Sequence, residues 1–173
     1  MKKLLVLYST RDGHTKKIVD FILKQNEQWC IDVNDLHTSL SISPEGYDQI
    51  LIAASIRYGH FHPSLNEYVQ KYKDVLCNKT WSFISVNLVA RKSEKNSPNT
   101  NLYTKKWLEQ TPVKPTYIEV VAGALQYSKY NWWQTLIIQF IMKMTGGNTD
   151  KSKDIEFTNW EKVQKFAEQL LKL

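Results

Sequence analysis

Five short apolar runs, rich in β-branched residues and separated by stretches long enough for a helix, constrain the fold of this chain most strongly. Runs that are apolar on both faces are typical of parallel strands covered by helices on either side. The pattern predicts an α/β fold: a doubly wound, five-stranded parallel sheet in the order 2-1-3-4-5, with right-handed crossovers. The expected strands cover residues 3–8, 30–36, 49–54, 81–87 and 117–122, and the expected helices 15–28, 64–76, 100–109 and 158–171.

The length of 173 residues favours a single domain. Cys30 and Cys77 are the only cysteines, so we expect no disulfide framework and a reducing, cytoplasmic environment. The first apolar run is too short for a signal peptide, and no export is implied.

The first apolar run ends in a turn with the composition of a phosphate-binding loop. Glycine permits close backbone approach, hydroxyls donate to phosphate oxygens, and the amides that open the following helix favour an anion. An ordinary helix N-cap would use the same residue types. The lysine-bearing nucleotide loop and the three-glycine dinucleotide fingerprint are absent, so the expected ligand is a mononucleotide phosphate. The turn comprises Ser9, Thr10, Arg11, Asp12, Gly13, His14 and Thr15.

Two further segments follow apolar runs and should meet this turn at the carboxyl edge of the sheet, where ligands bind. Tyr58 offers an aromatic face to a flat heterocycle, Gly59 permits close approach, and Asn87 can hydrogen-bond the polar edge of a ring. Together with the turn, these features predict a flavin. The two segments are Ala54, Ser55, Ile56, Arg57, Tyr58 and Gly59, and Asn87, Leu88, Val89, Ala90 and Arg91.

The net charge of +6 is concentrated in the middle of the chain. Residues 86–153 carry ten Lys and Arg against four Asp and Glu, and the flanking parts are almost neutral. This concentration of positive charge predicts an acidic partner. The partner could be anionic lipid, a carboxylated substrate or nucleic acid. A solvated lysine face is the alternative.

An insert at residues 126–153 separates the fifth run from a short apolar piece, residues 155–158, which is expected to complete the edge strand. The pattern of residues 132–144 predicts a helix about 20 Å long, which is shorter than the ~30 Å thickness of the hydrocarbon core of a bilayer. Its broad apolar side predicts either packing against the core, or a flap over the flavin that holds an apolar substrate or rests on a membrane. That side consists of Trp132, Trp133, Leu136, Ile137, Phe140, Ile141 and Met144, beside a polar stripe of Thr135, Gln139 and Lys143.

The chain resembles a known family along essentially its whole length. The motifs STRDG at 9–13, ASIRYGH at 54–60, SVNLVARK at 85–92, AGAL at 122–125 and IMKM at 141–144 are similar to those of the menaquinone-dependent protoporphyrinogen IX dehydrogenases, also called quinone-dependent protoporphyrinogen oxidases. The resemblance implies a flavodoxin-like fold with an insert interrupting the last strand. It implies oxidation of protoporphyrinogen IX to protoporphyrin IX in haem biosynthesis, FMN passing electrons to menaquinone or another membrane quinone such as ubiquinone.

The same resemblance places the FMN phosphate at the turn and the ring beside the two other segments, with Gly123 and Ala124. A porphyrinogen is a large apolar macrocycle with carboxylates, so apolar and basic side chains of the insert would contact it. The expected contacts of substrate or quinone are Lys92, Lys129, Trp132, Trp133 and Phe140, with Arg57 and Arg91 as further partners of carboxylates.

Two features leave chemical roles open. No catalytic residue is identified: His14, His60 and His62 are candidate general bases by location, but hydrogen bonding within loops is the expected role. Asp12 would repel a phosphate, so we expect it to cap the following helix and to be offset by Arg11.

Two other functions suit this sequence. One is an electron-carrier flavodoxin or general quinone reductase, because fold does not fix function. The other is a flavin-free module that binds nucleic acid. This function is disfavoured because the lysines are scattered over several elements. We therefore expect no nucleic acid and no metal, peripheral contact with an anionic membrane at the inner face of the cell membrane, and leave the pairing of protomers open.

Overall fold

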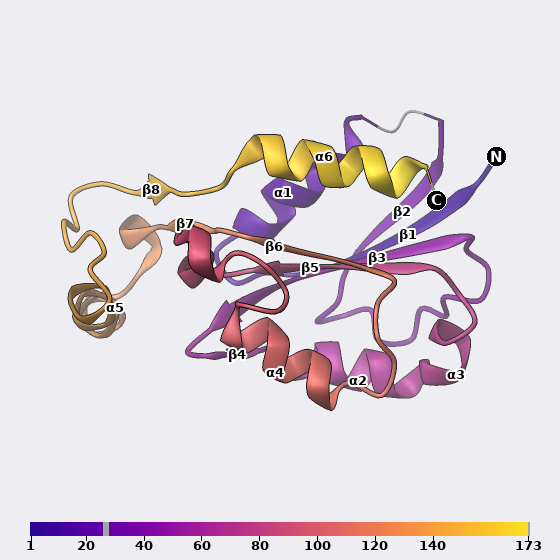
Figure 1. Cartoon of the computed structure of the whole chain (residues 1–173), viewed down its shortest axis with the longest axis horizontal. Helices are drawn as coiled ribbons and strands as arrows, with labels where there is room; N and C mark the ends of the chain where they lie inside the picture. The colour runs from indigo at the N-terminus through magenta and orange to yellow at the C-terminus, as the bar shows by residue number, and fades with distance from the viewer. Residues whose placement is uncertain (26–27, 173) are drawn as a thin grey trace.

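A parallel sheet between two layers of helices forms the body of the protein, as the computed structural model shows for residues 1–25 and 28–172 (Figure 1). The main strands lie in the order β2-β1-β3-β5-β6, which confirms the predicted fold class and strand order. These strands are β1 (Lys3–Ser9), β2 (Cys30–Asp35), β3 (Gln49–Arg57), β5 (Trp81–Val86) and β6 (Tyr117–Val121). A short strand, β4 (His60–Phe61), folds back on the end of β3.

Helices cover both faces of the sheet. One face carries α1 (His14–Leu23) and α6 (Trp160–Leu171), and the other α2 (Pro63–Lys71), α3 (Lys73–Leu76) and α4 (Leu102–Gln110) (Figure 1). The helix expected over residues 15–28 ends at Leu23, and residues 26 and 27 of that prediction lie outside the described residues. The helix expected over residues 64–76 is divided at Tyr72, whose φ of −108° interrupts the helical backbone.

Alternate side chains of the central strands enter two separate cores, because successive residues of a strand point to opposite faces. Leu51 and Ile84 pack on the side of α1 and α6, whereas Ile52 and Phe83 pack on the side of α2 and α4. Phe83 also stacks on Trp107 of α4, with 4.3 Å between ring centroids.

Strand register brings the carboxyl ends of four strands together at one edge of the sheet. Ser9 pairs with Ala54, and Val86 pairs with both Ser55 and Val121. The loops that follow β1, β3, β5 and β6 therefore meet, as the predicted strand order requires.

The insert contains a 3₁₀ turn, η3 (Tyr127–Lys129), and a helix, α5 (Trp132–Met144), which has the bounds expected from sequence. The side chains and backbones of Asn131 and Gln134 cap each other at its start. At its end Gly146 adopts a φ of 70°, and Gly147 N donates to Met142 O at 2.7 Å, as in a Schellman motif. Figure 1 shows α5 standing apart from the two helical layers, beyond the edge of the sheet where the loops meet.

The expectation that residues 155–158 complete the edge strand is wrong. Instead β8 (Ile155–Glu156) pairs antiparallel with β7 (Ala124–Leu125), outside the main sheet. The chain returning from the insert runs opposite to the chain entering it, so the two can pair only as an antiparallel ladder. This small ladder closes the base of the insert.

A buried polar cluster attaches the loop after β5 to α4. Asn101 is fully buried and its Nδ2 donates to Asn87 Oδ1 at 2.9 Å, while Thr104 Oγ1 donates to Ser85 Oγ at 2.8 Å. A buried polar group without a hydrogen-bond partner destabilises the fold, so each member of this cluster needs the others as its partners.

Replacing Asn101 by Ala is expected to lower the free energy of unfolding by about 2 kcal/mol, because it leaves buried partners unsatisfied and opens a small cavity. Urea unfolding followed by circular dichroism measures this. The exposed α6 substitution Gln164→Ala is the control and should change stability by less than about 0.5 kcal/mol. Equal stabilities of the two variants would contradict the prediction.

Candidate functional site

Two adjoining hollows lie where the loops meet. The first, the turn recess, has a volume of about 70 Å³ and is lined by Thr10, Arg11, Asp12, His14, Thr15, Ser55, Ile56, Arg57, Val86, Asn87, Leu88, Gly123 and Ala124. The second, the apolar cleft, has a volume of about 460 Å³ and is lined by Ile56, Arg57, Tyr58, Gly59, Asn87, Leu88, Val89, Arg91, Tyr103, Ile138, Ile141, Met142 and Thr145. The predicted segments after β1, β3 and β5 thus come together, with residues common to both hollows.

The turn after β1 has hydrogen-bond donors available for an anion. Gly13 is the N-cap of α1 with a φ of 88°, a conformation that glycine adopts readily, and no side chain caps the helix there. Thr15 Oγ1 is buried and has no hydrogen-bond partner among the described residues. Buried hydroxyls are normally satisfied, so this donor and the first amides of α1 fit a phosphate.

The role expected for Asp12 is wrong. It does not cap α1, and its carboxylate pairs with Arg57 Nη1 at 2.5 Å rather than with the neighbouring Arg11, which is exposed. Burial acts to lower the pKa of Arg57, but the Asp12 carboxylate and neighbouring tyrosines together raise it. The ring of Tyr130 lies 4.8 Å from the same guanidinium. Arg57 therefore neutralises the carboxylate in the turn.

The hairpin between β3 and β4 presents Tyr58 at the mouth of the apolar cleft. Tyr58 and Gly59 form its two-residue turn with φ values of 52° and 85°, as in a type I′ turn. Among the described residues, Tyr58 is the only one besides glycine with a positive φ. A bulky residue in this region costs free energy, and such strained residues cluster at functional sites.

Asn87 and Arg91 line the hollows but their side chains are engaged within the protein. Asn87 is 4% exposed, and its Oδ1 accepts from Ala90 N at 3.0 Å as well as from Asn101, so the expected hydrogen bond to a ring edge is not available from this atom. Arg91 Nη1 donates to Leu88 O at 2.9 Å and Nη2 to Thr145 Oγ1 at 3.0 Å. Arg91 thus ties the loop of η1 (Leu88–Arg91) to the end of α5.

Sequence reasoning missed the residues of α5 and α4 that close the apolar cleft. These are Tyr103, Ile138, Met142 and Thr145. Ile138 and Met142 are buried with Leu125 and Tyr127 and anchor α5 to the protein. Their i, i+4 spacing was the available signal, but they lie beside the polar stripe of the helix rather than on its broad apolar side.

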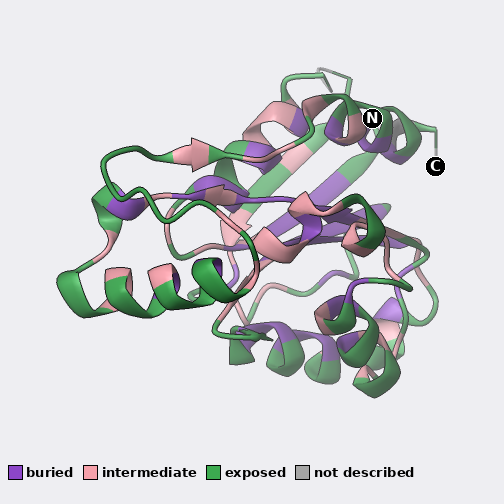
Figure 2. Cartoon of the chain, turned by 60° about the vertical axis from the view of Figure 1, so that its left-hand side comes forward, coloured by how far each residue is buried: buried purple, intermediate pink, exposed green. Residues whose placement is uncertain are grey.

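That broad apolar side faces away from the protein. Trp132, Phe140 and Met144 are 76%, 64% and 73% exposed, and Trp133, Leu136 and Ile137 are exposed as well. Figure 2 shows α5 mostly exposed along its length. Trp132, Trp133 and Phe140 line neither hollow. Of the two alternatives predicted for this side, packing against the core is wrong. Within the described residues, no helix is long and apolar enough to cross a membrane.

The remaining predicted site residues divide between core and surface. Ala54 and Ala90 are buried in the core and do not line the hollows, whereas Ser9 lines a smaller recess beside His37, to which it is hydrogen-bonded at 2.8 Å. Lys92 and Lys129 line neither hollow, but Lys129 lies against the turn, where its Nζ donates to Asp12 O.

The three candidate histidines lie at or in regular elements rather than within loops: His14 begins α1, His60 lies in β4 and His62 is the N-cap of α2. His14 Nε2 lies 2.6 Å from Thr158 Oγ1, and His62 Nδ1 lies 2.9 Å from Ser64 Oγ at the start of α2. Burial lowers the pKa of His14, although the Glu156 carboxylate opposes this shift.

Comparison with known proteins agrees with this geometry. The flavodoxin-domain family model matches residues 5–152, and the chain belongs to this family. Flavodoxin 1 from Bacillus cereus shares the fold with a TM-score of 0.53 at 17% identity, covering 99% of this chain and 98% of that chain. The FMN-bound flavodoxin of Fusobacterium nucleatum has a TM-score of 0.51 at 13% identity, with the same coverage.

Relatives with a named activity are more similar. The Escherichia coli K12 protein named protoporphyrinogen IX dehydrogenase (quinone) is 42% identical over 173 residues, which cover 99% of this chain and 96% of that protein. The Leishmania major protein of the same name is 45% identical over 168 residues, covering 95% of this chain and 73% of that protein. The similarity to the E. coli protein therefore includes the insert.

Replacing Tyr58 by Gly is expected to raise the free energy of unfolding by about 1 kcal/mol, because glycine adopts the positive φ of this turn without strain. The matched variant Tyr58→Ala keeps a Cβ and should show no such gain. Urea unfolding of both variants and the wild type makes the comparison. A glycine variant no more stable than the alanine variant would show that this backbone conformation is not strained.

Proposed function

We propose that this protein oxidises protoporphyrinogen IX to protoporphyrin IX in haem biosynthesis, with FMN as its cofactor and a membrane quinone as electron acceptor. The observation that carries the proposal is the similarity to enzymes of this name, which spans the sheet, its loops and the insert. The chain is thus an oxidoreductase with a flavodoxin fold.

The turn recess supports FMN as the cofactor. The unpartnered hydroxyl of Thr15, the first amides of α1 and the hydroxyl of Thr10 would hold the phosphate, and Gly13 permits its close approach. Tyr58 and Gly59 at the hairpin would border the ring. When bound, FMN would accept electrons from the porphyrinogen and pass them to the quinone.

The apolar cleft supports an apolar substrate beside that cofactor. Its volume of about 460 Å³ is that of a small-molecule site, and most of its lining side chains are apolar. Its two cations differ: Arg57 is paired with Asp12, whereas Arg91 has no carboxylate within ion-pair distance among the described residues. Arg91 would therefore attract one carboxylate of the macrocycle while it keeps its hydrogen bonds to Leu88 O and Thr145 Oγ1.

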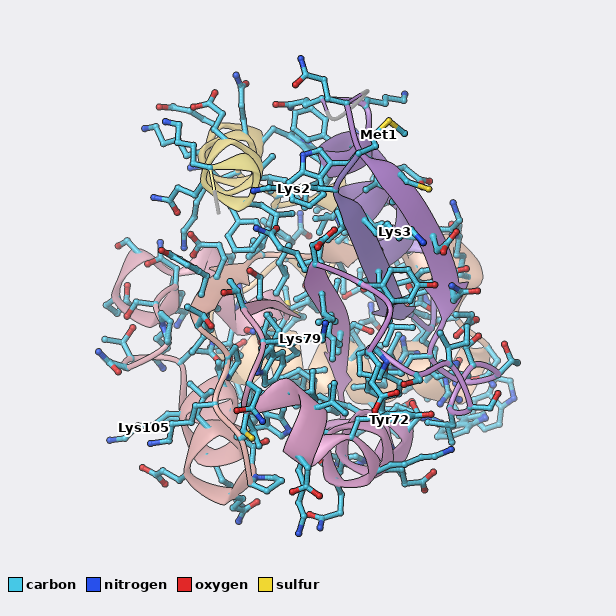
Figure 3. The ribbon with its side chains drawn as sticks, turned by 90° about the vertical axis from the view of Figure 1, so that its right-hand side faces the viewer. Met1, Lys2, Lys3, Tyr72, Lys79 and Lys105 are labelled. Carbon is cyan, nitrogen blue, oxygen red and sulfur yellow. The ribbon has the colours of Figure 1, made fainter. Side chains whose placement is uncertain are left out.

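The outward side of α5 supports peripheral binding to an anionic membrane at the cytoplasmic face. Contiguous exposed apolar patches on a protein mark interaction surfaces, and a short amphipathic helix with tryptophans and flanking lysines suits a lipid interface. Lys143, Lys151 and Lys153 lie exposed on or near the helix. Lys105 of the basic segment is remote from α5: Figure 3, viewed from the end opposite α5, shows it projecting outward from α4.

Anaerobic mixing of the FMN-loaded protein with protoporphyrinogen IX and a menaquinone analogue is expected to produce porphyrin fluorescence that grows with time. Without quinone, the yield should not exceed about one third of a porphyrin per protein, because forming a porphyrin removes six electrons and each FMN accepts two before an acceptor must reoxidise it. If the protein reduces the quinone with another donor but forms no porphyrin, it is a general quinone reductase and the substrate assignment is wrong.

The double variant Ile137→Glu/Phe140→Glu is expected to bind anionic vesicles at least about tenfold more weakly, since each apolar side chain contributes about 1.5–3 kcal/mol when buried. Sedimentation with vesicles containing phosphatidylglycerol measures binding, and high salt should weaken it for the wild type. Gln164→Glu on α6 is the control for added negative charge. Equal binding of the double variant and this control would exclude α5 as the membrane contact.

A further inference from the structure

We propose that Lys129 of the insert is a ligand of the FMN phosphate, so that cofactor binding fixes the insert against the sheet. This inference rests on the proposed function, because it requires FMN in the turn recess. Lys129 Nζ donates to the backbone carbonyl of Asp12, and a Cβ built on Gly13 would lie 3.8 Å from the same nitrogen. The ammonium group therefore lies against the turn that has the phosphate donors.

Lys129 is also one of the few cations near the turn that no carboxylate already neutralises. The neighbouring cations form ion pairs: Lys17 with Glu156 at 2.6 Å, Lys16 with Asp20 at 2.7 Å and Arg57 with Asp12 at 2.5 Å. Among the described residues, no carboxylate lies within ion-pair distance of Lys129, and the exposed Arg11 shares this property. Burial lowers the pKa of His14, which favours a neutral imidazole in the protein without a bound anion. Lys129 and Arg11 are thus the two cations left to add positive charge at a phosphate in the recess, and Lys129 is the one that belongs to the insert.

The backbone that carries Lys129 is held in place from several sides. Ser128 N and Oγ both donate to the Asp154 carboxylate, at 3.0 and 2.5 Å. Tyr127 is buried against α5, and the Tyr130 ring lies 4.8 Å from the Arg57 guanidinium. Because the segment is ordered by these contacts, little conformational entropy is lost when the lysine binds an anion.

A phosphate held by both the turn and Lys129 would join parts of the chain that are 117 residues apart. Thermodynamic coupling of this kind is reciprocal: if the placed insert strengthens FMN binding, FMN must stabilise the placed insert by the same free energy. Under this proposal, the phosphate is the part of the cofactor that Lys129 would contact. Riboflavin, which lacks the phosphate, therefore separates this coupling from all other flavin binding.

The test is titration of the flavin-free protein with FMN and with riboflavin, followed by flavin fluorescence. Lys129→Met is expected to raise the dissociation constant for FMN about tenfold, the effect of losing one charge-assisted hydrogen bond, and to leave that for riboflavin unchanged. Lys151→Met, the same charge change at an exposed position of the same insert, should leave both nearly unchanged. Retained riboflavin binding shows that the variant is folded.

Hydrogen exchange of the amides at residues 126–131 tests the reciprocal effect. FMN should protect them in the wild type more than riboflavin does, and this difference should disappear in Lys129→Met. Three results would each overturn the inference. Lys129→Met could bind FMN as tightly as the wild type does. Lys151→Met could weaken FMN binding as much as Lys129→Met does, or Lys129→Met could weaken riboflavin binding as much as FMN binding. A wild type that binds FMN and fails these tests refutes only the role of Lys129, whereas a wild type that binds no flavin refutes the proposed function too.

Discussion

The ion pair between Asp12 and Arg57 is the interaction on which the arrangement of the site depends. A carboxylate within an anion-binding turn would repel its ligand unless a cation neutralised it, and the Arg57 guanidinium does so at 2.5 Å. Both side chains are largely shielded from solvent, so salt screens their attraction less than that of a surface pair. Tyr130 packs over the same guanidinium. The turn after β1, the end of β3 and the insert therefore meet at one charged group, and the hollows form around it.

The insert is held at its base and at the end of α5. At its base, the β7–β8 ladder and the hydrogen bonds from Ser128 to Asp154 hold the chain, and at the far end Arg91 ties Thr145 to the loop after β5. Between these points, Ile138 and Met142 are the buried side chains of α5. A helix held in this way keeps one narrow side against the protein, and its broad apolar side is left for another surface.

Sequence periodicity predicts the sheet and its edge because apolar runs and turn residues are local signals. It does not predict the partner of Asp12: Arg11 is adjacent in sequence, but Arg57, 45 residues away, is brought beside it by the pairing of β1 with β3. It also does not orient α5, since an amphipathic pattern identifies an apolar side without showing what covers it. The inward position of Asn87 was missed for the same reason, because its partner Asn101 belongs to another element.

Ile141 connects the cleft with the exposed side of α5. It lines the apolar cleft, and at 44% exposure it also belongs to the outward apolar side of the helix. The cleft therefore opens beside the surface proposed to rest on lipid. Under the proposed function, a quinone and an apolar macrocycle dissolved in the membrane reach the cleft without crossing water, while the phosphate end of the cofactor stays in the turn recess on the far side of Arg57 and Leu88. A carrier that exchanges electrons with soluble partners needs no such apolar side. The orientation of α5 thus favours an enzyme that takes its reactants from a membrane.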